Sequence, residues 1–157
     1  MQPDIIFGPA QPPDWERVSA LLTSARLPLE GAQAHLSDFV LAFREGDLIG
    51  SAGLERYGEY ALLRSVAVAE SKRGKGLGFM LVKRMLAQAK QLGIVSLVLL
   101  TETAKDFFLR LGFREIARAA APEPVSVSVE FQHACPVSAT VMQLDFCGRY
   151  PMAQKTL

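Results

Sequence analysis

Residues 60–78 read YALLRSVAVAESKRGKGLG, and the rest of the chain is organised around this stretch. Its first half, from Tyr60 to Val68, is an apolar run typical of a buried strand. Its second half is a turn in which glycine alternates with lysine and leucine, followed by apolar residues at helical spacing. N–H groups at a helix start bind anions, and glycine lets a phosphate approach that backbone closely. The stretch therefore predicts a strand, a pyrophosphate-binding loop and a helix.

The spacing of the glycines distinguishes this loop from two other phosphate-binding motifs. A Walker A loop requires Gly, four residues and then Gly-Lys-Ser/Thr, and no such run occurs in the chain. A dinucleotide fingerprint requires Gly-x-Gly-x-x-Gly, whereas Gly74, Gly76 and Gly78 are spaced by two. The pattern that is present is Arg-x-x-Gly-x-Gly, starting at Arg73. A glycine-rich turn without a ligand is the alternative interpretation.

The Arg-x-x-Gly-x-Gly pattern resembles the acetyl-CoA pyrophosphate loop of the GNAT N-acetyltransferase superfamily. Residues 104–113, AKDFFLRLGF, resemble a second motif of that superfamily, Ala-x-x-Phe-Tyr-x-x-x-Gly-Phe. The resemblance, with both motifs and the elements around them, covers roughly residues 38–118. Shorter similarities, at residues 62–68, 99–104 and 130–139, resemble the arsenic-resistance N-acetyltransferase-like branch. That branch is similar in turn to the catalytic domain of N-acetylglutamate synthase.

The resemblance implies an α/β (α+β) fold, with a single GNAT-fold domain over residues 1–147 and a C-terminal tail at 148–157. The expected sheet is central, mixed and twisted, with about seven strands and flanking helices. Residue patterns predict strands at 4–7, 38–44, 48–56, 61–68, 94–100, 113–118 and 138–146. They predict helices at 14–28, 29–36, 77–92 and 104–110. Residues 125–133 are ambiguous, and we favour a short helix over a strand. The strands on either side of helix 77–92 are expected to be parallel.

Acetyl-CoA is the cosubstrate that the resemblance implies, and no metal is expected. The expected cofactor-binding residues lie on the central strand, in the glycine loop and around the second motif. They are Val66, Ala67, Val68, Arg73, Gly74, Lys75, Gly76, Leu77, Gly78, Thr101, Thr103, Phe107, Phe108 and Arg110. Thr103 is also the predicted N-cap of the short helix.

The implied chemistry is direct attack of an amine on the thioester, without an acyl-enzyme, so Cys135 and Cys147 are not expected to be nucleophiles. An amine attacks only in its neutral form, so a base must accept its proton. Glu55, on the strand beside the central one, is our candidate base, and an exposed strand-end carboxylate is the alternative. His35 is a second candidate, although a solvent-facing or capping histidine is the favoured interpretation.

Arg64 lies within an apolar strand, where an arginine needs a partner. Two interpretations stay open: it binds a substrate carboxylate bidentately, or it pairs with Glu55 or Glu59 across the sheet. The superfamily often places a tyrosine after the motif phenylalanine to protonate the leaving thiolate, but this chain has Phe108 there. The hydroxyl groups that remain as candidate proton donors are those of Tyr57, Tyr60, Ser65, Thr101 and Thr103. Our candidate catalytic residues are therefore Glu55, Arg64 and Ser65.

Composition narrows the class of protein. The chain has 157 residues, of which 50% are apolar and 21% charged, as in a single globular domain. A net charge of +1 argues against a nucleic-acid partner, and the apolar runs are too short for a membrane span. Two cysteines are too few for a disulfide framework, which favours a cytoplasmic setting.

The expected function is transfer of the acetyl group of acetyl-CoA to a small, amino-acid-like amine acceptor. A protein or peptide N-acetyltransferase is one alternative. A non-catalytic acyl-CoA-binding sensor or accessory protein in the arsenic response is another, favoured by the missing tyrosine. A homodimer is a further expectation, by analogy with the superfamily.

Overall fold

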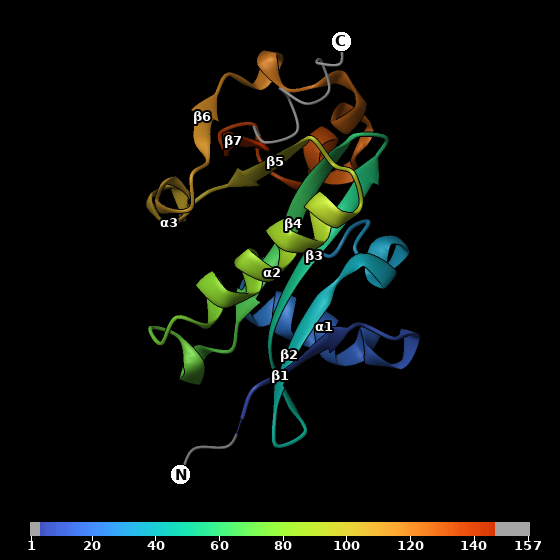
Figure 1. The fold of residues 1–157 in the computed structure, drawn as a ribbon, viewed down its shortest axis with the longest axis vertical. Coiled ribbons are helices and arrows are strands. Elements are labelled where there is room, and N and C mark those ends of the chain that lie inside the picture. Colours follow the sequence, from blue (N-terminus) through green and yellow to red (C-terminus); the bar gives the residue numbers. More distant parts are fainter. Residues whose placement is uncertain (1–3, 147–157) are drawn as a thin grey trace. The chain divides into compact units, whose positions relative to one another are not determined.

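The structure, a computed structural model, describes residues 4–146. Within that range seven strands form one sheet in the order β1-β2-β3-β4-β5-β7-β6 (Figure 1). The strands are β1 Ile6–Pro9, β2 Val40–Arg44, β3 Asp47–Tyr57, β4 Tyr60–Val68, β5 Ser96–Thr101, β6 Arg114–Ile116 and β7 Thr140–Asp145. The α-helices are α1 Trp15–Ser24, α2 Leu77–Gln91 and α3 Lys105–Arg110. β4 and β5 are parallel, whereas β1–β2, β2–β3, β5–β7 and β6–β7 are antiparallel, which confirms the predicted mixed sheet.

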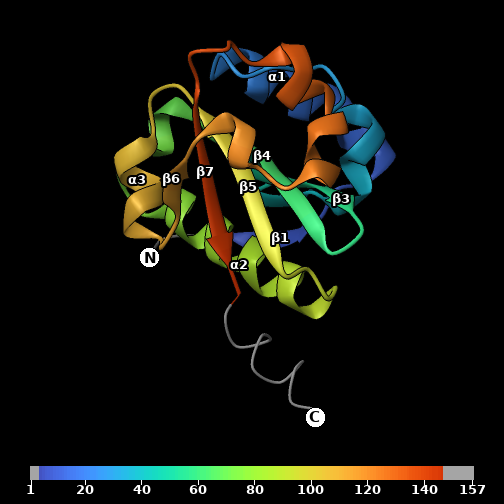
Figure 2. The same cartoon turned by 90° about the horizontal axis from the view of Figure 1, so that it is seen from above.

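The chain divides into two compact units, each with its own apolar core. As far as it is described, the first consists of residues up to Glu55 together with Leu63–Leu86. Its core includes Val18, Leu22, Phe39, Leu41 and Ala67. The second consists of Arg56–Leu62 and the residues from Ala87 onwards. Its core includes Leu62, Val98, Val125, Phe131 and Val141. In this second unit β7 lies between β5 and β6 (Figure 2).

Two tight turns place β2, β3 and β4 beside one another. Glu45 and Gly46 join β2 to β3 with φ of +53° and +83°, the pair of positive angles that a two-residue hairpin turn requires. Gly58, with φ of +67°, begins the two-residue connection between β3 and β4. These turns connect the strands predicted at 38–44, 48–56 and 61–68. Because β3 and β4 are neighbours in the sheet, side chains from the two strands can meet on one face.

Helical segments depart from the prediction in three places. The first helix, predicted over 14–28, ends at Ser24, and Arg26 with φ of +61° has already left the helical conformation before Pro28. The second helical piece is a 3-10 helix at Gln33–Asp38 rather than at 29–36. The Pro28 and Glu30 carbonyl groups, which a helix there would use, instead accept hydrogen bonds from Arg64. The prediction of Thr103 as an N-cap is also wrong. α3 begins at Lys105, its N-cap is Ala104, and the hydroxyl of Thr101 accepts the Ala104 N–H at 2.9 Å.

The ambiguous stretch is helical, as predicted. It forms a 3-10 helix at Glu123–Val127 and a π-helical turn at Glu130–Ala134. In the described part of the chain, no helix combines the length and apolar character needed to cross a membrane. Nor do residues 4–146 contain a group of three or more His, Cys, Asp or Glu side chains arranged to hold a metal ion. Cys147 and the predicted tail at 148–157 lie outside the described residues.

Candidate active site

The glycine loop follows β4 and leads directly into α2. Gly74 and Gly76 have φ of +81° and +85°, a region that residues with a Cβ rarely adopt. A Cβ built on either glycine meets no atom within 4 Å. The loop therefore needs glycine because of its backbone conformation, and the space beside both residues is open to an approaching group.

The start of α2 adds hydrogen-bond donors and positive charge to this loop. The first helical hydrogen bond joins the Met80 N–H to the Gly76 carbonyl oxygen at 3.1 Å. The amides of residues 77–79 precede that bond, so the geometry of a helix leaves them available to an anion. The Nε of Arg73 donates to the Val68 carbonyl oxygen at 3.0 Å and ties the loop to the end of β4. The exposed Arg73 and Lys75 add to the positive end of the helix dipole.

β4 contains a backbone irregularity that the sequence did not predict. Ser65 has φ of +59° within the strand, which is uncommon for a residue other than glycine. Two hydrogen bonds hold it: the Ser51 hydroxyl donates to the Ser65 carbonyl oxygen at 2.8 Å, and Arg64 Nε donates to Ser65 Oγ at 3.1 Å. Such a residue interrupts a strand as β-bulges do, and bulges recur beside active sites. After it, Val66 and Val68 are half-buried, while Ala67 points into the core.

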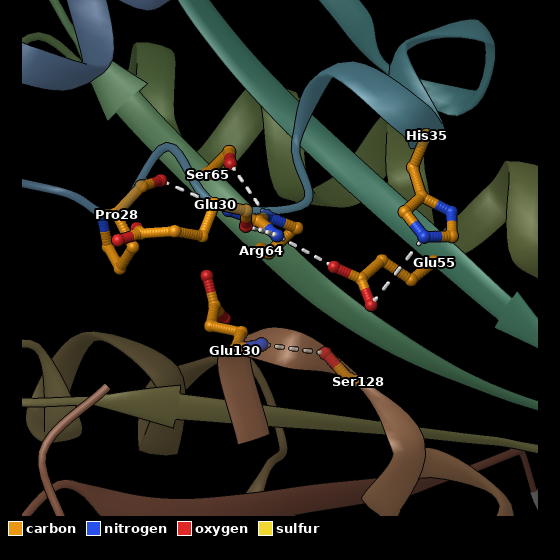
Figure 3. A network of polar contacts seen from close by, with 8 residues as sticks. All are labelled: Pro28, Glu30, His35, Glu55, Arg64, Ser65, Ser128 and Glu130. Carbon is orange, nitrogen blue, oxygen red and sulfur yellow. Dashed lines mark hydrogen bonds and ion pairs between the residues drawn. The ribbon is translucent and has the colours of Figure 1, made fainter. Parts of the chain in front are cut away.

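Arg64 is the centre of a buried polar network (Figure 3). Its NH1 donates to Glu55 Oε2 at 2.7 Å, and the side chains of both residues are at most 1% exposed. The same nitrogen donates to the Glu30 carbonyl oxygen at 2.8 Å, and NH2 donates to the Pro28 carbonyl oxygen at 3.0 Å. Of the interpretations that the sequence left open, the ion pair with Glu55 is therefore present. One guanidinium group joins β3, β4 and the segment that follows α1.

Glu55 and His35 meet on the other side of this network. The interpretation of Glu55 as an exposed strand-end carboxylate is wrong, because the residue is 1% exposed. Its Oε1 lies 3.9 Å from Nε2 of His35, whose side chain is 29% exposed. The buried carboxylate thus lies between a guanidinium group and an imidazole. The sequence predicted Glu55 as a possible partner of Arg64, but nothing in the spacing of His35 indicated that it joins them.

The remaining predicted residues lie in the second unit. Phe108 is buried, and its ring packs edge-on against Phe107 at 4.9 Å and Phe113 at 5.6 Å between centroids. Thr101 is half-buried, and its hydroxyl oxygen accepts the hydrogen bond from Ala104 at the start of α3. Thr103 and Arg110 are exposed. Phe108 is therefore a core side chain of this unit.

These features define a class of protein. The chain belongs to the acetyltransferase (GNAT) family, whose family model matches residues 6–113. It is 33% identical over 98 residues to an uncharacterized N-acetyltransferase of Chlorobaculum tepidum, a match that covers 62% of this chain and 63% of that relative. The chain thus spans less than two thirds of that relative's length.

Solved structures share the fold at lower sequence identity. N-acetylglutamate synthase of Neisseria gonorrhoeae, complexed with coenzyme A and N-acetyl-glutamate, matches with a TM-score of 0.77 and 19% identity. The match covers 92% of this chain and 36% of that one. A Mycobacterium tuberculosis protein complexed with CoA and NLQ matches with a TM-score of 0.73 and 21% identity, over 89% of this chain and 98% of that one. A GNAT-family acetyltransferase of Staphylococcus aureus has a TM-score of 0.74 at 18% identity, over 90% and 99%.

Proposed function

We propose that this chain is an N-acetyltransferase that transfers the acetyl group of acetyl-CoA to the amine of a small, amino-acid-like acceptor. The observation that carries the proposal is the loop at residues 73–78, where Gly74 and Gly76 have positive φ and α2 begins. Such a loop at a helix start suits an anion. Membership of the GNAT family supports it. The relative named as an N-acetyltransferase, and the CoA in two structural neighbours, agree with it.

In this proposal the amides of residues 73–78 and the side chain of Lys75 bind the pyrophosphate of acetyl-CoA. The main-chain groups of residues 66–68, which follow the left-handed Ser65, bind the pantetheine arm and polarise the thioester carbonyl. Thr101, Thr103, Phe107, Phe108 and Arg110 remain predicted cofactor contacts, of which the exposed Thr103 and Arg110 are the more accessible.

The reaction is a direct transfer. A base takes one proton from the acceptor ammonium group, and the amine lone pair then forms a C–N bond to the thioester carbonyl carbon. The C–S bond breaks with its electron pair on sulfur, and the second proton of the attacking nitrogen goes to the thiolate. Ser65 is a proposed carrier of that proton, because its oxygen accepts a hydrogen bond from Arg64 and its own O–H remains a donor.

The proposal also specifies the class of acceptor, an amino-acid-like amine. It is supported by the N-acetyl-glutamate in the structural neighbour with a TM-score of 0.77. Placement in the arsenic-resistance-like branch, a cytoplasmic setting and a homodimer stay predictions from the sequence.

Free thiol released from acetyl-CoA measures the reaction directly. The test incubates the protein with acetyl-CoA and a panel of amino acids, amine antibiotics, herbicide-like amino acids and short peptides. We expect turnover with at least one amino acid and none with peptides. CoA binding without turnover on the whole panel would contradict the proposal, and turnover on peptides alone would replace the small acceptor with a protein substrate.

A further inference from the structure

A series of polar contacts links His35 to the irregular residue of β4 (Figure 3). His35 Nε2 lies 3.9 Å from one oxygen of Glu55, and the other oxygen accepts a hydrogen bond from Arg64 at 2.7 Å. Arg64 Nε in turn donates to Ser65 Oγ at 3.1 Å. Each link lies within the first compact unit. The series therefore begins at a partly exposed imidazole and ends at Ser65. Ser65 immediately precedes residues 66–68, which we propose to bind acetyl-CoA.

Of the two residues in contact, His35 is better placed than Glu55 to accept a proton from the acceptor. Glu55 is 1% exposed, and its charge is compensated by a guanidinium group at 2.7 Å. Protonation of this carboxylate would break its buried ion pair with Arg64. The side chain of His35 is 29% exposed, so an acceptor amine or a bridging water can reach it. A neutral imidazole has one ring nitrogen without a hydrogen, and that nitrogen can accept a proton.

The charged groups around His35 come from three elements. Glu55 on β3 lies next to the ring, and Arg64 on β4 lies behind that carboxylate. Asp38 lies three residues further along the same 3-10 helix, where such residues share a face. The carboxylates of Glu55 and Asp38 are negatively charged, and Arg64 carries the positive charge on the far side of Glu55.

We propose that His35 is the general base of the acetyl transfer and that Glu55 is a positioning residue that holds its imidazole. This assignment rests on the proposed function. The unprotonated ring nitrogen takes one proton from the acceptor ammonium group, directly or through one water, and the ring becomes an imidazolium. The freed lone pair attacks the thioester carbon, the C–S bond breaks, and CoA leaves with the second nitrogen proton. The imidazolium then returns its proton to solvent.

His35→Gln tests the assignment, because it keeps a polar side chain at a partly exposed site but removes the imidazole. The acceptor is the panel amino acid that the wild-type protein turns over fastest. We expect kcat to fall by about 100-fold or more, as for the loss of a general base. The ascending limb of kcat/KM against pH should move toward the pKa of the acceptor's own ammonium group, while KM for acetyl-CoA should not change.

Two further variants separate catalysis from packing. Gln33→Ala changes an exposed residue of the same 3-10 helix and should keep the wild-type profile. His35→Ala should regain part of its activity when imidazole is added, with the acetylated amino acid measured by mass spectrometry because imidazole itself accepts acetyl groups. A purely structural histidine would not be rescued in this way.

The outcomes are distinguishable. If the wild-type protein is active and His35→Gln retains both kcat and the position of the ascending limb, the assignment is overturned and the proposed function stands. Lack of rescue of an inactive but folded His35→Ala by imidazole would also count against it. A wild-type protein that turns over no member of the panel contradicts the proposed function, and the assignment with it.

Discussion

Replacing Arg64 by methionine should destabilise the protein more than the loss of one hydrogen bond. Methionine roughly preserves the length and volume of the side chain but removes its charge and all its donors. Glu55, which is 1% exposed, would stay buried without the guanidinium group that lies 2.7 Å away. The carbonyl oxygens of Pro28 and Glu30 would lose a charged donor as well.

The size of the loss follows from this geometry. Removing one partner of a buried ion pair costs about 3–5 kcal/mol, because the other charge is left in a poorly solvating environment. Glu55→Gln should cost a similar amount, since it leaves the charge of Arg64 buried. The double variant Arg64→Met/Glu55→Gln removes both charges. Its loss should therefore fall short of the sum of the single losses by about 2–3 kcal/mol, within the range of measured coupling energies.

Urea unfolding followed by circular dichroism at 25 °C measures these free energies of unfolding. The surface pair Arg114–Asp145 supplies the control, because its side chains are 59% and 52% exposed although their atoms lie 3.1 Å apart. Arg114→Met should cost less than about 1 kcal/mol. If the double variant at Arg64 and Glu55 equals the sum of the singles within about 0.5 kcal/mol, the two residues are not coupled and the reasoning is wrong.

Three further predictions concern other parts of the chain. Gly76→Ala and Gly46→Ala each introduce a Cβ at nearly equal φ, +85° and +83°. Both variants should therefore lose about 1–2 kcal/mol of stability. Only Gly76→Ala should also weaken CoA binding. Titration calorimetry checks this, and equal CoA affinity of the two variants would refute the role of the loop. Partial burial raises the pKa of Asp145, but hydrogen bonds from Ser96, Gln143 and Arg114 outweigh it and lower that pKa below its ordinary value of 3.8. Wild type should therefore be more stable than Asp145→Asn above pH 3.8, and this difference should be lost as the pH falls below that value. A difference in free energy of unfolding that persists at about pH 2 would contradict the prediction. Phe108→Tyr should lower the free energy of unfolding by about 1–3 kcal/mol, because its hydroxyl enters a ring cluster, and an unchanged thermal melting curve would show that position 108 is not core.

The sequence by itself determined the features that depend on neighbouring residues. The strand, the glycine loop and the helix over residues 60–78 follow from apolar patterning and from glycine, both of which act over a few residues. The order of the strands along the chain follows for the same reason. The requirement that Arg64 have a partner also follows from sequence, because an apolar strand does not tolerate a lone charge.

Only the tertiary structure decided which groups meet. It selects Glu55 rather than Glu59 as the partner of Arg64, and it uses the carbonyl groups of residues 28 and 30 to complete the site. It also twists Ser65 into a left-handed conformation, which no residue preference at that position indicates. These contacts join segments up to 36 residues apart in the chain, and packing of whole elements sets such distances. Local patterns therefore predicted the cofactor loop, while the cluster of His35, Glu55 and Arg64 exists only in the folded chain.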